Sequence, residues 1–271
     1  MSADTTPTVM PLSRLAGIAR ELTVTQRLQP VDRPRLALDI LWYRALRFTS
    51  LPREDTARTI GMRDGSRLTY RLNRGDLQAI REIWIEGAYI PPPEARDVRY
   101  VVDLGANIGL TSVYLHRQLK PDYVIAVEPD PANAAILRRN LAQNRVPALV
   151  LEAAAGPVDG RASFRRERDS NVGRLDTAGG LEVEVLSIAS ILDLLPDHPG
   201  QVLLKMDIEG GEDAVFRGDL SWLDRIHCFQ GELHLGHADT DAISALLDRS
   251  GLPFRPGAIP GRGPAACWVR T

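Results

Sequence analysis

Residues 101–109 have the sequence VVDLGANIG, in which an apolar run leads to an acid, Asp103, and then to two glycines, Gly105 and Gly109. The run predicts a buried β-strand, and the glycine spacing predicts a tight turn that opens a helix. Ligands of open α/β sheets bind at the carboxyl ends of such strands, and an acid beside the turn suits a ligand with a positive amino group. The spacing differs from G-x-G-x-x-G, which disfavours a pyrophosphate cradle. A turn without any ligand is the competing interpretation.

Strand patterns alternate with helical patterns from residue 99 onward. This alternation predicts one parallel sheet with helices on both faces, an α/β fold. After the first strand, the expected strands are DYVIAVEP, PALVLEAAA, QVLLKMDIEG and IHCFQGELHL, at residues 122–129, 147–155, 201–210 and 226–235. Two short runs near the end, residues 252–256 and 265–271, predict an antiparallel edge pair.

The first 98 residues have a different pattern. Apolar residues between Leu15 and Phe48 recur at helical spacing, and Asp64-Gly65 between two alternating runs predicts a hairpin. A further helix is expected to end near Gly87, before the prolines at 91–93. We therefore predict a mostly helical cap with a short hairpin over residues 1–98, and a ligand-binding domain over residues 99–271.

Composition narrows the class of function. The net charge of −2 over 271 residues argues against binding nucleic acid or an anionic membrane. Neither a long apolar run nor a signal-peptide pattern occurs, so we expect a cytoplasmic protein. Cys228 and Cys267 have no metal-binding spacing and predict two buried free thiols. Arginine outnumbers lysine strongly, which favours a bacterial source with a GC-rich genome.

Glu128 stands at the end of the second expected strand, 19 positions after Gly109. An acid about 20 positions beyond such a glycine turn binds the ribose hydroxyls in nucleotide-binding βαβ units. The competing interpretation is that Glu128 or Asp130 only caps the helix that begins near Pro131.

More acids follow the next two expected strands. Asp207, Glu209 and Glu212 follow Lys205 at the end of the run 201–206. Carboxylates this close need compensation, from Lys205, a substrate proton or a bound cation. Caps at a helix start would explain Glu212 equally well.

Glu232 and His234 lie two residues apart at the end of the fifth expected strand, so their side chains share a face. A histidine beside a carboxylate suits general base catalysis, and the same groups could hold a hard cation. Between the third and fourth strands, a polar loop at residues 167–180 is expected to be mobile and to recognise an acceptor.

Taken together, DLGANIG, EPDPANAAILRRNLAQN, KMDIEGGE and the Glu-Leu-His element resemble the FkbM family of S-adenosylmethionine-dependent methyltransferases. The resemblance covers about residues 65–235, and it includes RLNRGDLQAIREIWIEGAY and LEAAAGPVDGRASF. Gly211 stands where alanine is common in the family's EG-x-E run.

The resemblance implies a class I methyltransferase fold, a Rossmann-like, seven-stranded and mostly parallel sheet, and O-methylation of a small molecule such as a sugar or secondary metabolite. It also implies which residues bind the cofactor. The methionine end would lie at Asp103, Gly105, Asn107 and Gly109, the ribose at Glu128, and the adenine near Ala153 and Ala154. Glu82 and Tyr89 are further candidates for the cofactor edge.

The predicted catalytic centre consists of Asp207, Glu232 and His234, with Glu209 in support. His234 could act as a general base, or Asp207, Glu232 and His234 could bind a divalent cation such as Mg²⁺ that acidifies the acceptor hydroxyl. The expected partner is a small hydroxyl compound, and a homodimer is compatible with the sequence. A non-catalytic binding protein of the same fold, a nicotinamide-dependent oxidoreductase and a nucleic-acid methyltransferase are the alternatives.

Overall fold

The central sheet of the molecule has seven strands in the order β12-β13-β11-β10-β3-β4-β5. Our computed structural model describes residues 19, 22–46, 57–166, 173–176, 180–195, 201–208, 211–231, 245–248, 254–257 and 266–270. The strands are β3 (Tyr100–Leu104), β4 (Tyr123–Val127), β5 (Ala148–Leu151), β10 (Val202–Met206), β11 (Cys228–Gly231), β12 (Phe254–Pro256) and β13 (Ala266–Arg270). Neighbouring strands among β11, β10, β3, β4 and β5 are parallel, whereas β13 runs antiparallel to β11 and β12. The predicted class I sheet and its antiparallel edge pair are confirmed.

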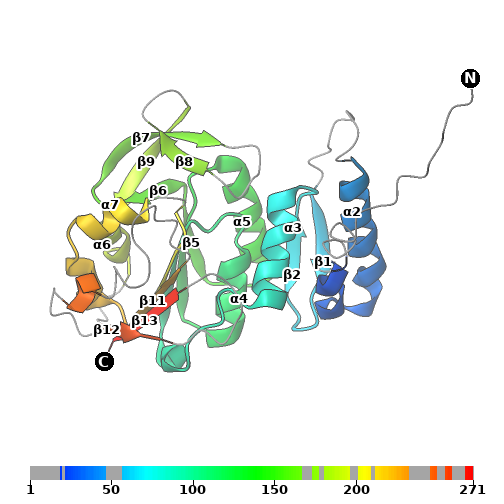
Figure 1. Cartoon of the computed structure of the whole chain (residues 1–271), viewed down its shortest axis with the longest axis horizontal. Helices are drawn as coiled ribbons and strands as arrows, with labels where there is room; N and C mark the ends of the chain where they lie inside the picture. The colour runs from blue at the N-terminus through cyan, green and yellow to red at the C-terminus, as the bar shows by residue number, and fades with distance from the viewer. Residues whose placement is uncertain are drawn as a thin grey trace, which may run out of the picture.

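Helices cover both faces of this sheet (Figure 1). One core lies beneath α4 (Leu110–Leu119) and α5 (Pro131–Gln143), and the other beneath α6 (Ile188–Leu192) and α7 (Glu212–Arg217). Successive strand residues alternate between the two cores: Val101 belongs to the first and Val102 to the second. A slip of one residue in register would exchange the faces, so burial on both sides fixes which side chains reach the strand ends.

A second sheet interrupts the alternation. It contains β6 (Ala153–Gly156), β9 (Leu181–Ser187), β7 (Gly160–Arg166) and β8 (Gly173–Asp176), in that order. The single strand expected at 147–155 is wrong, because the chain leaves the central sheet at Glu152 and β6 pairs with β9 instead. Part of the expected loop 167–180 is also a strand, since β8 pairs with β7. Residues 167–172 and 177–179 lie outside the described residues, so the expected mobility of the loop stays a prediction.

The N-terminal segment combines short helices with a hairpin. Its elements are η1 (Thr23–Arg27), η2 (Pro30–Asp32), α2 (Arg33–Leu46), β1 (Arg58–Gly61), β2 (Arg67–Tyr70), α3 (Arg74–Arg81), the π-helical turn η3 (Glu82–Glu86) and η4 (Pro93–Asp97). The hairpin predicted at Asp64-Gly65 is confirmed: Gly65 has a φ of 88° and Asp64 accepts from the Ser66 amide. The predicted helix end is also confirmed, since Gly87 is left-handed with a φ of 69°.

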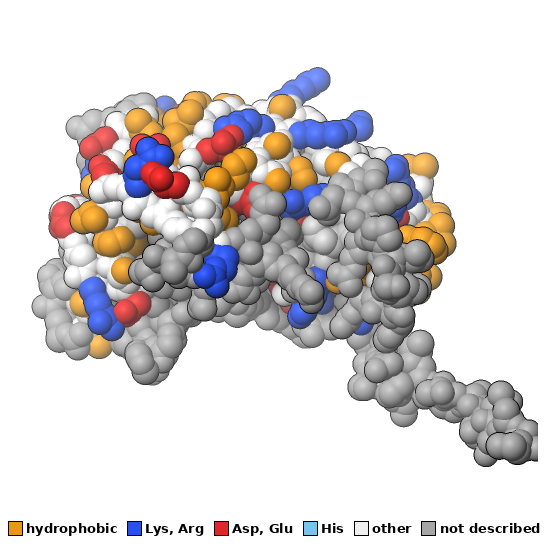
Figure 2. All heavy atoms as spheres, turned by 90° about the horizontal axis from the view of Figure 1, so that it is seen from above, with side chains coloured by type: hydrophobic (Ala, Val, Ile, Leu, Met, Phe, Trp, Pro, Cys, Tyr) orange, Lys and Arg blue, Asp and Glu red, His pale blue; other side chains and the backbone are white. Residues whose placement is uncertain are grey.

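This segment packs beside α4 and α5 (Figure 1). Ile60, Leu68 and Ile80 share one hydrophobic core with Val113 and Leu137 of those helices. The outer face of α2 still carries exposed apolar side chains, and apolar side chains gather at this end of the molecule in Figure 2. No described helix is long and apolar enough to cross a membrane. Both cysteines are buried and free, as expected.

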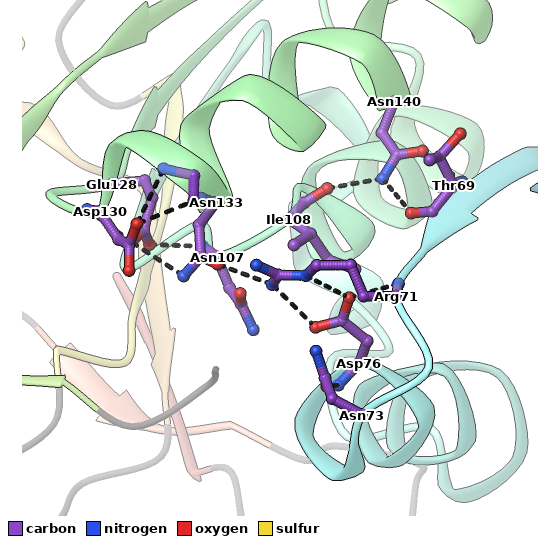
Figure 3. A network of polar contacts seen from close by, with 11 residues as sticks. Thr69, Arg71, Asn73, Asp76, Asn107, Ile108, Glu128, Asp130, Asn133 and Asn140 are labelled. Atoms are coloured by element: carbon purple, nitrogen blue, oxygen red, sulfur yellow. Dashed lines mark hydrogen bonds and ion pairs between the residues drawn. The ribbon is translucent and has the colours of Figure 1, made fainter. Parts of the chain in front are cut away.

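Side-chain amides of α5 and of its C-terminal cap residue satisfy the open edge of β2. Asn140 accepts from the Thr69 amide at 2.7 Å and donates to the Thr69 carbonyl at 2.9 Å, as a neighbouring strand would. Asn144 makes the same pair of contacts with Arg67. The Asn140 amide also donates to the Ile108 carbonyl at 2.7 Å, which ties the hairpin to the glycine turn (Figure 3).

Replacement of Asn140 should therefore destabilise the fold. Asn140→Ala leaves an amide and two carbonyls buried without their partner, and we expect a loss of about 3 kcal/mol in the free energy of unfolding. Urea denaturation measures it, with the exposed neighbour Arg139→Ala as control, for which we expect a change within about 0.5 kcal/mol. Equal stabilities of the two variants would contradict this role of Asn140.

Candidate functional site

The carboxyl ends of β3, β4 and β10 meet around the glycine turn. Gly105 and Ala106 donate their amides to the Val127 carbonyl, and Asp207 donates its amide to the Leu104 carbonyl. Gly105 has a φ of 72°, and a Cβ there would lie 1.8 Å from the Asp207 carbonyl oxygen. Only glycine fits at this crossing, so the turn and the acid after β10 are held in direct contact.

Gly109 meets a similar restriction, with a φ of 81° and a Cβ position 2.5 Å from Leu137 Cδ1. Here the neighbour is α5, so the second glycine brings the start of α4 close to that helix. Asn107 between the two glycines is left-handed, with a φ of 49°. Its buried Oδ1 has no hydrogen-bond partner among the described residues.

Glu128 lies directly after β4 and is 5% exposed. Its carboxylate accepts from the Asn107 amide at 2.8 Å, the Asp130 amide at 2.9 Å and Asn133 Nδ2 at 3.2 Å (Figure 3). Burial raises the pKa of Glu128 to about 7, against the opposing effect of these three donors. The three donors therefore do not fully compensate the loss of solvation of the buried Glu128 carboxylate.

Asp130 caps α5, because its carboxylate accepts from the Ala132 and Asn133 amides. Pro131 occupies the first helical position, where a missing N–H costs nothing. The two acids at the end of β4 therefore differ in role. Asp130 caps the helix, whereas Glu128 accepts from the turn that is the candidate ligand site.

Lys205 forms the centre of the site, with a side chain 2% exposed. Its Nζ donates to the Gly105 and Leu104 carbonyls at 2.8 and 3.2 Å, and lies 3.1 Å from Asp103 Oδ1. It also lies 3.9 Å from Asp207 Oδ2 and 5.4 Å from the centre of the Tyr89 ring. Burial alone would lower the pKa of Lys205, but Asp103 and Asp207 outweigh it and raise that pKa. The ammonium group is therefore a fixed positive charge.

Asp103 is the partner of the buried lysine. Its side chain is fully buried, with Lys205 on one oxygen and the Ser112 hydroxyl 2.6 Å from the other. Its role at the methionine end of the cofactor stays a prediction, and the contacts of the described residues show a carboxylate that supports the strand ends. The reason is the buried lysine, whose charge requires a partner.

Tyr89 and Asp207 lie next to this ion pair. The Tyr89 hydroxyl donates to Asp207 Oδ2 at 2.8 Å, and the Asp207 side chain is 24% exposed. Gln230 of β11, at the register position of Lys205, donates to the Tyr89 carbonyl at 3.5 Å. A tyrosine of the N-terminal segment thus reaches the acid at the end of β10.

The other sequence-predicted residues fall into three groups. Glu82, the first residue of η3, accepts from Gln78 and Arg81 of the preceding helix α3, and its place at the cofactor edge stays a prediction. Ala153 and Ala154 are buried at the start of β6, and their place near the adenine stays a prediction. Glu209, Glu232 and His234 lie outside the described residues, and within the described part of the chain no group of acids, histidines or cysteines could hold a metal ion.

Sequence reasoning missed several residues of the site, among them Ser112, Asn133, Gln230 and Arg71. Arg71 and Gln230 act through contacts with residues 62 and 141 positions away in the chain, so no local motif marks them. Asn133 could have been found, because it lies in the first turn of the helix that follows Glu128.

The residues around the turn fit S-adenosylmethionine. Asn107 Oδ1 is an acceptor without a partner among the described residues, and Glu128 is a carboxylate suited to ribose hydroxyls. The absence of a Cβ at Gly105 and Gly109 keeps the turn closely packed on its neighbours. These groups match the acceptors that an amino group and a ribose require.

Two methyltransferases are similar to this chain in sequence. The chain is 27% identical over 232 residues to 31-O-demethyl-FK506 methyltransferase FkbM of Streptomyces tacrolimicus, covering 71% of this chain and 88% of that protein. It is 26% identical over 197 residues to Methyltransferase 1 of Beauveria bassiana, covering 63% and 78% respectively.

Among solved structures, methyltransferase FkbM from Methylobacillus flagellatus KT is 17% identical, with a TM-score of 0.47. That alignment covers 95% of this chain and 60% of the solved one. The model of the methyltransferase FkbM domain matches residues 103–252, which include the glycine turn, Glu128, Lys205 and Asp207. Because this match covers more than half of the chain, the protein belongs to the FkbM methyltransferase family.

Proposed function

We propose that this methyltransferase uses S-adenosylmethionine to methylate a hydroxyl group of a small molecule, such as a sugar or a secondary metabolite. The observation that carries the proposal is the contact between two sets of groups. The glycine turn and Glu128 suit the cofactor, and Asp207 with Tyr89 suits a hydroxyl acceptor directly beside it. The name of the Streptomyces relative, which describes an O-demethyl substrate, supports a hydroxyl as acceptor.

In this proposal Glu128 binds the ribose hydroxyls, and Asn107 with the glycine turn holds the methionine end. S-adenosylmethionine supplies a methyl group that is already activated as part of a sulfonium. The protein therefore has to orient the acceptor, exclude water and remove the hydroxyl proton.

Asp207 is the described residue best placed for that last task. Its carboxylate is partly exposed, receives the Tyr89 hydroxyl on Oδ2, and lies next to the positive charge of Lys205. A carboxylate held in this way could accept a hydrogen bond from an acceptor hydroxyl and take its proton. Glu209, Glu232 and His234 remain proposed members of the same centre from their sequence positions, as bases or as cation ligands.

The cofactor assignment predicts a binding defect. Calorimetry with S-adenosylhomocysteine should show binding to the wild type, and Glu128→Gln should weaken it at least about 100-fold, because two charge-assisted hydrogen bonds are lost. Glu182→Gln, the same change at an exposed glutamate of β9, is the control and should bind as the wild type does. Unchanged affinity in Glu128→Gln would exclude the ribose assignment.

Burial of Glu128 also predicts a pH-dependent stability difference. A carboxyl whose pKa is raised from 4.5 to about 7 on folding stabilises the protein below pH 4.5, and this contribution is lost as the pH rises through 7. Glu128→Gln does not titrate. Between pH 4.5 and 8 the wild type should therefore lose about 3 kcal/mol relative to the variant, as measured by urea denaturation without ligand. A difference that does not vary with pH would contradict the raised pKa.

The catalytic assignment predicts a loss of rate at unchanged cofactor affinity. With labelled S-adenosylmethionine and a panel of sugars, polyols and phenols, Asp207→Asn should lower kcat at least about 100-fold, and Tyr89→Phe by about 10-fold. The activity of His234→Ala and the effect of a chelator on the wild type distinguish a general base from a bound cation. Loss of activity with the chelator would indicate a cation, and loss in His234→Ala without a chelator effect would indicate a base. Transfer only to amines or thiols would contradict O-methylation, and full activity of Asp207→Asn would remove Asp207 from the centre.

A further inference from the structure

A continuous series of buried polar contacts connects the N-terminal hairpin to Glu128. It begins at Arg71, directly after β2, whose Nε and Nη2 donate to the two oxygens of Asp76 at 3.0 Å each. The Arg71 amide donates to the same carboxylate at 2.7 Å, and Asp76 is fully buried. This two-point pairing fixes the plane and the position of the guanidinium.

The guanidinium then reaches the first turn of α5. Arg71 Nη2 donates to Asn133 Oδ1 at 2.7 Å, and Asn133 Nδ2 donates to Glu128 Oε1 at 3.2 Å (Figure 3). A side-chain amide has an acceptor end and a donor end of nearly equal size, so its orientation is set by its neighbours. Because a guanidinium can only donate, Arg71 requires the oxygen of Asn133 to face it. The NH₂ group is thereby turned to Glu128.

We propose that Arg71 is a positioning residue of the cofactor site, which fixes the Asn133 amide so that Glu128 is held as a carboxylate that can accept the ribose hydroxyls. The proposal rests on the proposed cofactor role of Glu128. Loss of Arg71 removes the donor that requires the Asn133 oxygen, so the opposite orientation, with this oxygen against Glu128, becomes accessible. That contact is favourable only when the Glu128 carboxyl is protonated, and a protonated carboxyl is a poorer acceptor for two hydroxyls.

The charges around Glu128 make this orientation matter. The Asp130 carboxylate, at the N-terminal cap of α5, opposes ionisation of Glu128, whereas the Asp130 amide and Lys205 on β10 favour it. Lys205 is already paired with Asp103, and Arg71 with Asp76, so neither cation is reserved for Glu128. With a pKa of about 7, a small change in the surrounding dipoles moves Glu128 between its two forms at neutral pH.

The test compares the pH dependence of S-adenosylhomocysteine binding in wild type and in Arg71→Met, by calorimetry between pH 6 and 9. In the wild type the affinity should rise through about pH 7 and level off above about pH 8. In Arg71→Met we expect an affinity about 5-fold lower at pH 7 that recovers at pH 9, because the midpoint moves up by about one pH unit. Arg67→Met, at an exposed arginine of β2, is the matched control and should keep the wild-type profile.

A second comparison separates this role from a purely structural one. In an Asn133→Leu background the effect of Arg71→Met on the pH midpoint should vanish, because Arg71 acts through Asn133. Arg71→Lys, which keeps a donor and a charge, should lie between wild type and Arg71→Met, and it provides a folded variant if the methionine variant is unstable. An affinity loss equal at every pH, or effects of Arg71 and Asn133 that simply add, would overturn the inference. Absence of binding by the wild type at any pH would instead refute the proposed function.

Discussion

A single ammonium group joins the carboxyl ends of β3 and β10. Lys205 is buried at the point where Gly105, Asp103, Asp207 and Tyr89 converge, and it contacts all four. A charge without water needs close partners, so the lysine requires an acid on the neighbouring strand and carbonyls turned towards it. The position of the glycine turn and the position of the candidate catalytic acid are therefore two consequences of satisfying one buried charge.

The crossing of Gly105 over the Asp207 backbone adds a steric constraint to this electrostatic one. Since the Asp207 carbonyl lies where a side chain at residue 105 would begin, the two strand ends approach as closely as backbones can. The candidate cofactor turn and the candidate acceptor acid are therefore packed against each other without a spacer. An in-line transfer of a small group needs its two reactants at near contact, and this packing provides the protein framework for it.

Much of the fold could be predicted because its signals are local. The apolar runs, the Asp64-Gly65 turn and Gly87 at a helix end each act through neighbours in the chain, and the structure confirms them. The departure of the chain from the central sheet at Glu152 could not be predicted, because an apolar run does not indicate which sheet its strand joins. The burial of Asp103 depends on Lys205, about 100 positions away, so sequence spacing placed Asp103 at the strand end but did not indicate its pairing with the lysine.

The contacts of the N-terminal segment could not be predicted from local sequence patterns either. Its pattern divides the chain near residue 98, but Ile60, Leu68 and Ile80 belong to the core beneath α4 and α5, so the core crosses that division. From this segment Tyr89 reaches Asp207 and Arg71 reaches the partner of Glu128. The candidate acceptor side and the candidate cofactor side of the site are thus both contacted by residues that precede the family match at 103. In this protein the segment before the matched domain contributes contacts to the candidate site, so differences in that segment would change these contacts without altering any residue of the glycine turn.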